Sequence, residues 1–255
     1  MASRFVAGAV DYDGAMARNY DAGRQLSVDA ANAWRAALAP HLDAAAGQVL
    51  LDLGAGTGRF SILLADWFTL HVVGVEPAQG MRRVAHAHPS VTYLGGRAEA
   101  IPLRNGCCNI ALLSNVIHHI TDRLQCAREL RRVLHAAALV LIRGAFAGRL
   151  DDISLFRYFP EAKRVADQFP SIDDVVHTFA NVGFTRSAEH RVTQQTSPSL
   201  REFAARTRTR ADTTLTLLAD AEFQRGQAAL ERAAAAEVVP TPVLDTLDLL
   251  VLQAS

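Results

Sequence analysis

The fold is decided by one stretch of the sequence, Val49-Leu50-Leu51-Asp52-Leu53-Gly54-Ala55-Gly56-Thr57-Gly58-Arg59-Phe60. Its first five residues form an apolar run of strand length that contains one acid, which is typical of a buried parallel strand. Three alternating glycines follow, and an apolar-periodic segment typical of a helix begins at Arg59. Glycine reaches positive φ at little steric cost and lets a ligand approach bare backbone N–H groups. The stretch therefore predicts a strand, a tight ligand-binding turn and a helix N-terminus.

The spacing of these glycines separates two classes of nucleotide-binding turn. Dinucleotide-binding folds carry G-x-G-x-x-G, whereas here Gly58 lies one position earlier and Arg59 occupies the last place. The spacing disfavours a nicotinamide-dependent dehydrogenase. An ordinary glycine-rich turn stays open from this motif alone.

The composition limits the class of protein. Half of the 255 residues are hydrophobic, which suffices for one α/β domain with a cap or for two small domains. The 26 basic and 26 acidic residues give a formal net charge of zero, whereas nucleic-acid-binding proteins usually carry a basic surplus. The balance disfavours a nucleic-acid partner, although a basic patch in a balanced total stays open.

Cysteine usage and the N-terminus bear on the cellular compartment. Cys107, Cys108 and Cys126 form neither a disulfide framework nor a zinc-binding spacing, so we expect reduced thiols and no metal. The first 13 residues lack the pattern of a signal peptide, and no apolar run approaches membrane-spanning length. We expect a cytoplasmic protein without a membrane partner, and a homodimer stays open.

Strand and helix patterns alternate from residue 48 to about residue 143. The predicted strands are Gln48–Leu53, His71–Glu76, Val91–Leu94, Asn109–Ser114 and Leu139–Arg143, and the predicted helices are Arg59–Trp67, Gln79–Ala87 and Arg123–Leu134. Such alternation favours a doubly wound parallel sheet with helices on both faces. Ligands of such sheets bind beyond the carboxyl ends of the strands. The glycine turn, Glu76, Ser114 and Arg143 should therefore share one rim.

The flanking segments predict helices and two further strands. Ala15–Leu42 is helix-like with a break near Gly23, and Leu200–Ala236 has helical composition. Asp173–Val182 predicts a helix that Gly183 ends, and Phe184–Thr193 and Val243–Leu252 predict strands. We expect lid helices over residues 1–45, a cofactor-binding domain over 46–198 and 238–255, and a helical cap inserted at 199–237.

An acid lies where the second predicted strand ends. Glu76 follows Gly58 by 18 residues and precedes Pro77, and an acid at such a position can accept hydrogen bonds from both ribose hydroxyls of an adenosine. Met81, one turn into the next helix, can pack against an adenine ring. A solvated carboxylate and a core methionine are the simpler alternatives.

With these residues the sequence resembles the class I S-adenosylmethionine-dependent methyltransferases, in their small-molecule branch. Five segments carry the resemblance over roughly residues 20–143: the glycine turn, Val73-Gly74-Val75-Glu76-Pro77, Gly96-Arg97-Ala98-Glu99-Ala100-Ile101-Pro102-Leu103, the strand Asn109–Ser114 with the loop Asn115-Val116-Ile117-His118-His119-Ile120, and Glu129-Leu130-Arg131-Arg132-Val133-Leu134. It implies a Rossmann-like, mostly parallel seven-stranded sheet of order 3-2-1-4-5-7-6, with strand seven antiparallel. Ala136-Ala137-Ala138 replaces the family's Pro-Gly-Gly turn.

The resemblance also implies a cofactor, S-adenosylmethionine. Asp52 and the turn amides can hold its methionine end, and backbone around Ala98 and Glu99 would meet its adenine. Tyr20 and Arg24 precede the sheet, where the family carries a lid helix, and Arg24 can pair with the cofactor carboxylate. The cofactor-binding residues that we predict are Tyr20, Arg24, Asp52, Gly54, Ala55, Gly56, Gly58, Glu76, Pro77, Met81, Ala98, Glu99, Ser114 and Asn115.

His118 and His119 follow the fourth strand, beside the position from which the methyl group would emerge. A histidine titrates near pH ~6.5 and suits proton removal from a phenol, an amine or an indole-like acceptor. We expect one of the pair to face the site and the other to pack in the core, and the sequence leaves open which is which. The segment Ser114-Asn115-Val116-Ile117 lacks the Asn/Asp-Pro-Pro-aromatic motif of enzymes that methylate nucleobase amino groups.

Acceptor binding is expected on segments that do not bind cofactor. His119, Arg143, Phe146, Phe156 and Tyr158 are the predicted substrate-binding residues, and Arg206-Thr207-Arg208-Thr209-Arg210 predicts a solvated basic face. The predicted function is methyl transfer to a small, partly hydrophobic metabolite through an oxygen, nitrogen or carbon atom. A protein- or tRNA-modifying methyltransferase and a non-catalytic protein that binds the cofactor or S-adenosylhomocysteine remain the alternatives.

Overall fold

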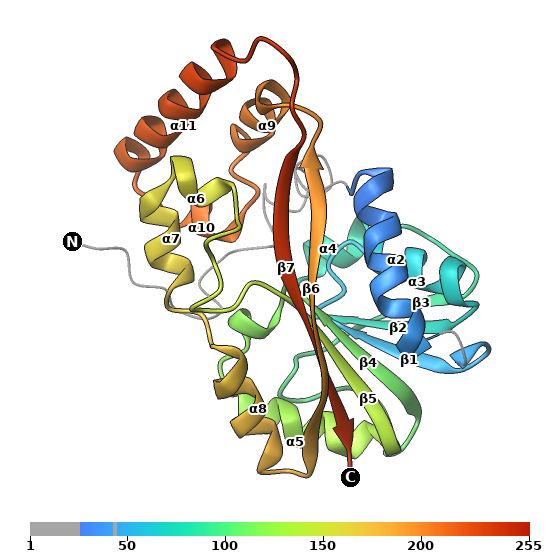
Figure 1. Cartoon of the computed structure of the whole chain (residues 1–255). Helices are drawn as coiled ribbons and strands as arrows, with labels where there is room; N and C mark the ends of the chain where they lie inside the picture. The colour runs from blue at the N-terminus through green and yellow to red at the C-terminus, as the bar shows by residue number, and fades with distance from the viewer. Residues whose placement is uncertain (1–25, 43–44) are drawn as a thin grey trace.

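The computed structural model describes residues 26–42 and 45–255, and in this part of the chain a seven-stranded sheet is flanked by helices (Figure 1). Its strands are β1 Val49–Leu53, β2 His71–Glu76, β3 Val91–Gly95, β4 Cys108–Ser114, β5 Leu134–Gly144, β6 Phe184–Ser197 and β7 Val243–Ala254. Its helices are α2 Val28–Leu42, α3 Arg59–Phe68, α4 Gln79–Arg83, the short 3-10 helix η2 Ile117–His119, α5 Arg123–Val133, α6 Leu155–Tyr158, α7 Pro160–Ala166, α8 Ile172–Ala180, α9 Leu200–Thr207, α10 Thr213–Thr216 and α11 Asp220–Ala235.

The strand order β3-β2-β1-β4-β5-β7-β6 confirms the predicted topology. β1 pairs in parallel with β2 on one side and with β4 on the other. β7 is antiparallel to both of its neighbours, β5 and β6. Because the chain winds in opposite directions from β1 and β4, a crevice opens at the carboxyl ends of these two strands.

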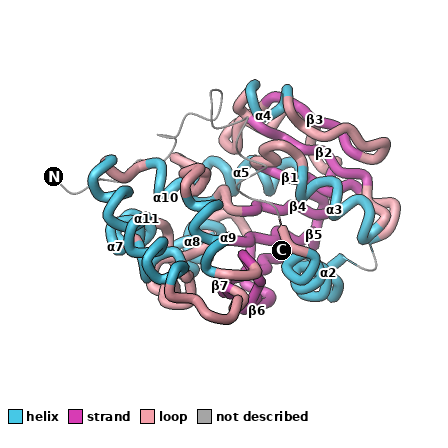
Figure 2. Tube along the Cα trace, turned by 90° about the horizontal axis from the view of Figure 1, so that it is seen from above, coloured by secondary structure: helices cyan, strands magenta, loops and turns pink. Residues whose placement is uncertain are grey.

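Alternating strand residues supply two core layers, one on each face of the sheet. In β1, Leu50 packs in the layer formed with α2 and α3, which contains Trp34 and Leu64. Its neighbour Leu51 packs in the opposite layer, with residues of α5 and α8 such as Leu130. Figure 2 shows these helices on the two sides of the strands. Both faces are covered, which explains why the β1 sequence is almost continuously apolar.

β6 and β7 continue beyond the sheet as a two-stranded ribbon. β7 pairs with β5 only from Gln253 to Asp248, whereas its pairing with β6 continues to Val243 (Figure 1). We call residues 192–197 and 243–247 the outer ribbon. Helices α9, α10 and α11 connect its two strands, and with α6 and α7 they enclose a third apolar cluster around Phe159, Phe203 and Leu230.

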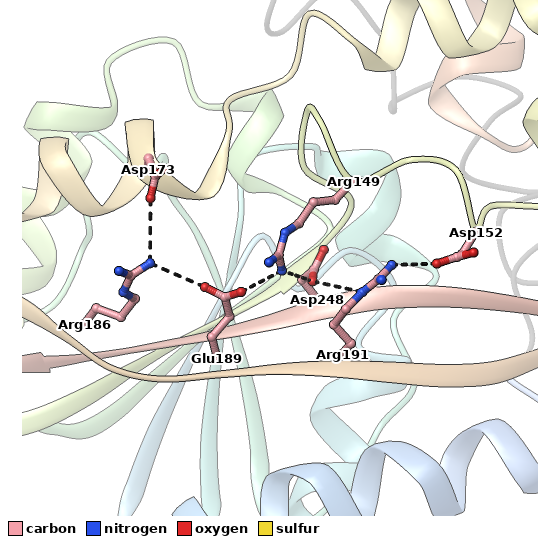
Figure 3. A network of polar contacts seen from close by, with 7 residues as sticks. All are labelled: Arg149, Asp152, Asp173, Arg186, Glu189, Arg191 and Asp248. Carbon is pink, nitrogen blue, oxygen red and sulfur yellow. Dashed lines mark hydrogen bonds and ion pairs between the residues drawn. The ribbon is translucent and has the colours of Figure 1, made fainter.

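Charged side chains tie the loop after β5 to the base of this ribbon (Figure 3). Arg149 Nη1 lies 2.7 Å from Asp248 Oδ1 and 2.6 Å from Glu189 Oε1. Arg191 Nη2 lies 2.8 Å from Asp152 Oδ2, and its Nε lies 3.8 Å from Asp248 Oδ1. Only 2% of the Asp248 side chain is exposed, so this carboxylate is the buried centre of the network.

Three predicted elements differ from the structure by four or five residues at one end. β5 starts at Leu134 instead of Leu139, because the alanine run stays in the strand and only Ala137 adopts positive φ, at 59°. β6 extends to Ser197 instead of Thr193, because β7 continues alongside it. The helix predicted over Gln79–Ala87 ends at Arg83. There the His86 N–H donates to Thr57 O, which ties the segment to the glycine turn.

Among the helices that the structure describes, none combines the length and the apolar character needed to cross a bilayer.

Candidate active site

The glycine turn after β1 adopts a conformation that requires glycine at two crowded positions. Gly54, Gly56 and Gly58 have φ of 80°, 59° and 76°. A Cβ on Gly58 would lie 1.8 Å from Tyr93 Oη, and one on Gly54 would lie 2.5 Å from Val116 Cγ2. These positions therefore combine left-handed backbone with close packing, and the turn exposes backbone where a ligand can approach.

The turn is fastened to the end of β2. Val75 O accepts hydrogen bonds from Gly54 N at 2.7 Å and from Ala55 N at 3.3 Å. Gly56 N donates to Glu76 Oε2 at 3.0 Å. The amides that we expected to hold a ligand thus bond within the protein, so a ligand here would be held by close approach to the turn and by side chains.

Asp52 is the acid that precedes the turn, and it is buried on the cavity wall with 1% of its surface exposed. Its Oδ2 accepts a hydrogen bond of 2.6 Å from Ser61 Oγ. Burial raises the pKa of Asp52 to about 6, with a smaller contribution from Glu76, and the Ser61 hydrogen bond opposes the shift. A ligand cation placed here would restore the charged form.

The predicted ribose-binding acid lies at the carboxyl end of β2. Glu76 is 7% exposed, and besides Gly56 N it accepts a hydrogen bond from Ala78 N at 2.9 Å. Pro77 O accepts a hydrogen bond of 2.8 Å from Arg82 Nη1. Met81 is buried. The Glu76 carboxylate is therefore held in place at the rim by backbone donors.

The loop after β3, which contains Ala98 and Glu99, is held by α5. Glu129 Oε2 accepts from Ile101 N at 2.8 Å, and Arg132 Nη2 donates to Ile101 O at 2.9 Å. Glu99 Oε1 accepts a hydrogen bond of 2.9 Å from Thr121 Oγ1. The Glu99 side chain thus binds the segment just before α5, and the backbone of the loop also bonds within the protein, at Ala100 N and at Ile101 N and O.

One cavity brings together residues from the glycine turn, the strand ends and the cap. Of the predicted cofactor residues, its lining includes Asp52, Gly54, Ala55, Gly56, Ser114 and Asn115. The lining that the structure describes does not reach Gly58, Glu76, Pro77, Met81, Ala98 or Glu99, which lie along the rim towards β2 and β3. Tyr20 and Arg24 lie outside the described residues.

The two histidines after β4 have different surroundings. His118 lines the cavity and stacks on Phe169, with ring centroids 4.1 Å apart and an interplanar angle of 13°. His119 Nε2 lies 3.3 Å from the hydroxyl of Thr213 at the start of α10. His118 is therefore the ring at the cavity, and His119 contacts the cap.

The predicted substrate residues divide between the cavity and the core. Arg143 and Phe156 line the cavity. Phe146 does not, and that prediction is corrected: its side chain is fully buried in the core layer that contains Ile172 and Val175. Tyr158 packs on the third apolar cluster and is likewise absent from the described lining.

The basic run of α9 is not uniformly solvated, which corrects a second prediction. Arg208 pairs with Glu231 and Arg210 with Asp220 at the surface. Arg206 instead lines the cavity and donates to Thr196 O on β6. Arg206 lies in the last turn of α9, whereas Arg208 and Arg210 follow the end of this helix, and this separates Arg206 from the other two arginines.

Sequence reasoning missed the polar side chains that the outer ribbon and the cap bring to this cavity. They are Gln194, Thr207, Asp212, Thr213, Thr214 and Asp245. The sequence gives only a weak sign of these polar side chains, because Asp245 and Asp248 interrupt an otherwise apolar strand sequence.

Comparison with known proteins finds a methyltransferase domain in part of the chain. Residues 51–142 match the model of a family described as methyltransferase domain. An uncharacterized methyltransferase of Mycobacterium avium (strain 104) is 31% identical over 141 residues, which cover 52% of this chain and 53% of that protein. The malonyl-[acyl-carrier protein] O-methyltransferase of Methylococcus capsulatus is 34% identical over 137 residues, covering 50% of this chain and 46% of that protein. The chain thus spans about half the length of these relatives.

A solved structure shares the fold of this chain. It is described as a methyltransferase from an antibiotic biosynthesis pathway of Anabaena variabilis ATCC 29413, and it matches with a TM-score of 0.70 at 20% identity, covering 87% of this chain and 96% of that one. Residues 51–142 therefore match a methyltransferase domain, and the sheet order is the one that the sequence resemblance to class I S-adenosylmethionine-dependent methyltransferases implies.

Proposed function

We propose that this protein transfers a methyl group from S-adenosylmethionine to a small, partly hydrophobic metabolite. One observation carries the proposal: a single cavity runs from Asp52 and the glycine turn, past Ser114 at the end of β4, to a wall of apolar side chains that includes Phe156 and Phe203. Such a cavity would hold a donor at one end and an acceptor at the other, where both apolar and polar side chains form the lining.

The residues at the sheet edge fit the cofactor. S-adenosylmethionine would supply a methyl group already activated on a sulfonium sulfur. Asp52 would bind the ammonium group of its methionine end, where the buried carboxylate lacks an opposite charge among its described hydrogen-bond partners. The Glu76 carboxylate would accept from the ribose hydroxyls, and the backbone after β3 would meet the adenine.

The chemistry left to the protein is positioning and proton removal. The acceptor must be held in line with the transferred methyl group and shielded from water. His118 would take the proton of a hydroxyl or N–H acceptor on a ring nitrogen, and its stacking on Phe169 fixes the plane of the ring. The malonyl-[acyl-carrier protein] O-methyltransferase among the relatives supports oxygen as one candidate acceptor atom.

Two measurements test the proposal. Calorimetry with S-adenosylmethionine and with NAD should give binding of the former only, since the glycine spacing disfavours a dinucleotide. Incubation with S-adenosylmethionine and a metabolite library should release S-adenosylhomocysteine with at least one small molecule. Binding of NAD alone would contradict the class of cofactor. Cofactor binding without turnover on any small molecule, but with turnover on protein or tRNA, would contradict the class of acceptor.

A further inference from the structure

The inner face of the outer ribbon contributes a row of polar side chains to the cavity wall. Arg143, at the end of β5, donates from Nη1 to Ser114 Oγ at 3.1 Å and from Nη2 to Gln194 Oε1 at 3.2 Å. Gln194 on β6 is the register partner of Asp245 on β7. Directly paired residues of antiparallel strands project from the same face with Cβ atoms about 4.5–5.5 Å apart. The row therefore runs from the end of β4 to the base of the cap.

Gln194 is 8% exposed, and its carboxamide has a fixed orientation. Its Oε1 accepts two hydrogen bonds, from Trp34 Nε1 at 2.7 Å and from Arg143 Nη2. Both partners are obligate donors, so Oε1 is the oxygen and Nε2 the amide nitrogen. No described residue accepts a hydrogen bond from Nε2, while Gln194 lines the cavity. A buried amide donor is thus presented to the cavity.

Asp245 supplies the complementary acceptor. It also lines the cavity, and its Oδ1 accepts from Ser154 N at 2.8 Å, which holds the carboxyl group against the loop before α6. Burial raises the pKa of Asp245, and the hydrogen bonds from Ser154 and the guanidinium of Arg206 partly offset this effect. Beside each other, Gln194 offers N–H donors and Asp245 offers carboxylate acceptors.

Resting on the proposed function, we infer that Gln194 and Asp245 determine specificity by binding a hydroxyl group of the acceptor. A hydroxyl accepts one hydrogen bond and donates another, so it satisfies the amide and the carboxylate together. An ammonium group only donates and a carboxylate only accepts, so each leaves one of the two residues unsatisfied. Sites built to bind a hydroxyl reject analogues that lack it, because their buried polar groups then lack partners.

The test uses three probes with one aromatic skeleton, chosen because Phe156 and Phe203 line the cavity: 2-phenylethanol, 2-phenylethylamine and ethylbenzene. Binding to the full chain saturated with S-adenosylhomocysteine is measured by ligand-observed NMR titration. We expect the alcohol to bind at least about tenfold more tightly than the amine or the hydrocarbon, which corresponds to one lost hydrogen-bond pairing. Gln194→Glu and Asp245→Asn should each remove this preference.

The controls separate this inference from the proposed function. Gln253→Glu and Asp152→Asn make the same chemical changes at exposed positions outside the cavity, and they should keep the preference. Affinity for S-adenosylhomocysteine and the melting temperature should be unchanged in all four variants. Equal binding of the three probes, tighter binding of the amine, no binding of any probe, or an unchanged preference in both site variants would overturn the inference. Failure of the native chain to bind S-adenosylhomocysteine would instead contradict the proposed function.

Discussion

Asp52 places a carboxyl group where the fold destabilises its charge. Its pKa of about 6 lies above its usual 3.8 because the group is buried. The folded protein therefore binds more protons than the unfolded chain between these values, and this group's contribution to stability falls as pH rises from about 4 to about 6. A pKa shift of this size lowers the free energy of unfolding by about 3 kcal/mol at neutral pH relative to low pH.

We predict that Asp52→Asn raises the free energy of unfolding by up to about 3 kcal/mol at pH 7.5, because the amide stays neutral. The gain should be much smaller at pH 4, where Asp52 is protonated in the folded protein and only partly ionised in the unfolded chain. Urea denaturation at the two pH values measures the difference. A gain that is equal at both pH values would contradict an origin in ionisation.

The same group predicts how cofactor affinity depends on pH. If the Asp52 carboxylate binds the ammonium group of S-adenosylmethionine, affinity should rise as pH increases from about 5 to about 7 and the carboxyl group ionises. Calorimetry across this range measures the trend. Asp52→Asn should bind more weakly and with a flat pH profile, and a rising profile in that variant would assign the titration to another group.

Glu76 gives a prediction for the ribose site. Glu76→Gln keeps the size of the side chain but replaces one acceptor oxygen by a donor that faces Gly56 N or Ala78 N. We expect affinity for S-adenosylmethionine to fall by about 1–3 kcal/mol. Asp66→Asn, on the exposed side of α3, is the control and should bind normally. Unchanged affinity in Glu76→Gln would refute the ribose role.

The two histidines differ in the kinetic parameter that they should affect. His118→Gln should lower kcat by about 10²–10⁴-fold for hydroxyl or N–H acceptors if His118 is the general base. His119→Gln removes the contact with Thr213 and should mainly raise KM for the acceptor. Steady-state kinetics with calorimetry of cofactor binding distinguishes the two effects. Equal activity of both variants would remove the acid–base proposal.

At the scale of elements, the glycine turn gives a test with a matched control. Gly58→Ala combines left-handed backbone, which costs about 1–2 kcal/mol for alanine, with a clash against Tyr93 that adds about 1–3 kcal/mol. Gly47→Ala has almost the same φ, 77°, and no atom within 4 Å of its Cβ. We predict a larger loss of unfolding free energy at Gly58, measured by chemical denaturation. Equal losses at the two positions would show that Tyr93 moves aside freely.

The elements also show what the sequence can predict. The strands β1, β2 and β4 were predictable because both of their faces are buried, which leaves an apolar run of defined length. The positions of Gln194 and Asp245 in the cavity were not predictable from the sequence. Two register shifts in β6, at Arg186/Ala188 and Gln195/Ser197, decide which face of the ribbon its side chains occupy. Phe146 was predicted in the cavity because the sequence places it at a strand end, but its orientation depends on the packing of α8.

At the scale of the whole molecule, the network around Asp248 joins the sheet to the loop before α6. Burial raises the pKa of Asp248 and the pairing with Arg149 opposes this shift. The loss expected for Asp248→Asn therefore comes from the weaker acceptor left for Arg149, and we predict about 1–3 kcal/mol of unfolding free energy. Asp152→Asn is the control within the same network, since its side chain is 58% exposed. That variant should lose at most about 1 kcal/mol. Urea denaturation measures both, and equal losses would contradict a special role for the buried carboxylate.

The connection between β6 and β7 has a consequence for protein engineering. The chain leaves the sheet along one strand of the outer ribbon and returns along its register partner, so residues 198–242 form a contiguous cassette. The glycine turn, Asp52 and Glu76 lie outside it. Replacing this cassette with a designed one should therefore change which molecules bind in the cavity. The carboxyl ends of β1 and β2 should keep their structure. The ends of such a graft are set by one pair of residues, Ser197 and Val243, which face each other across the ribbon.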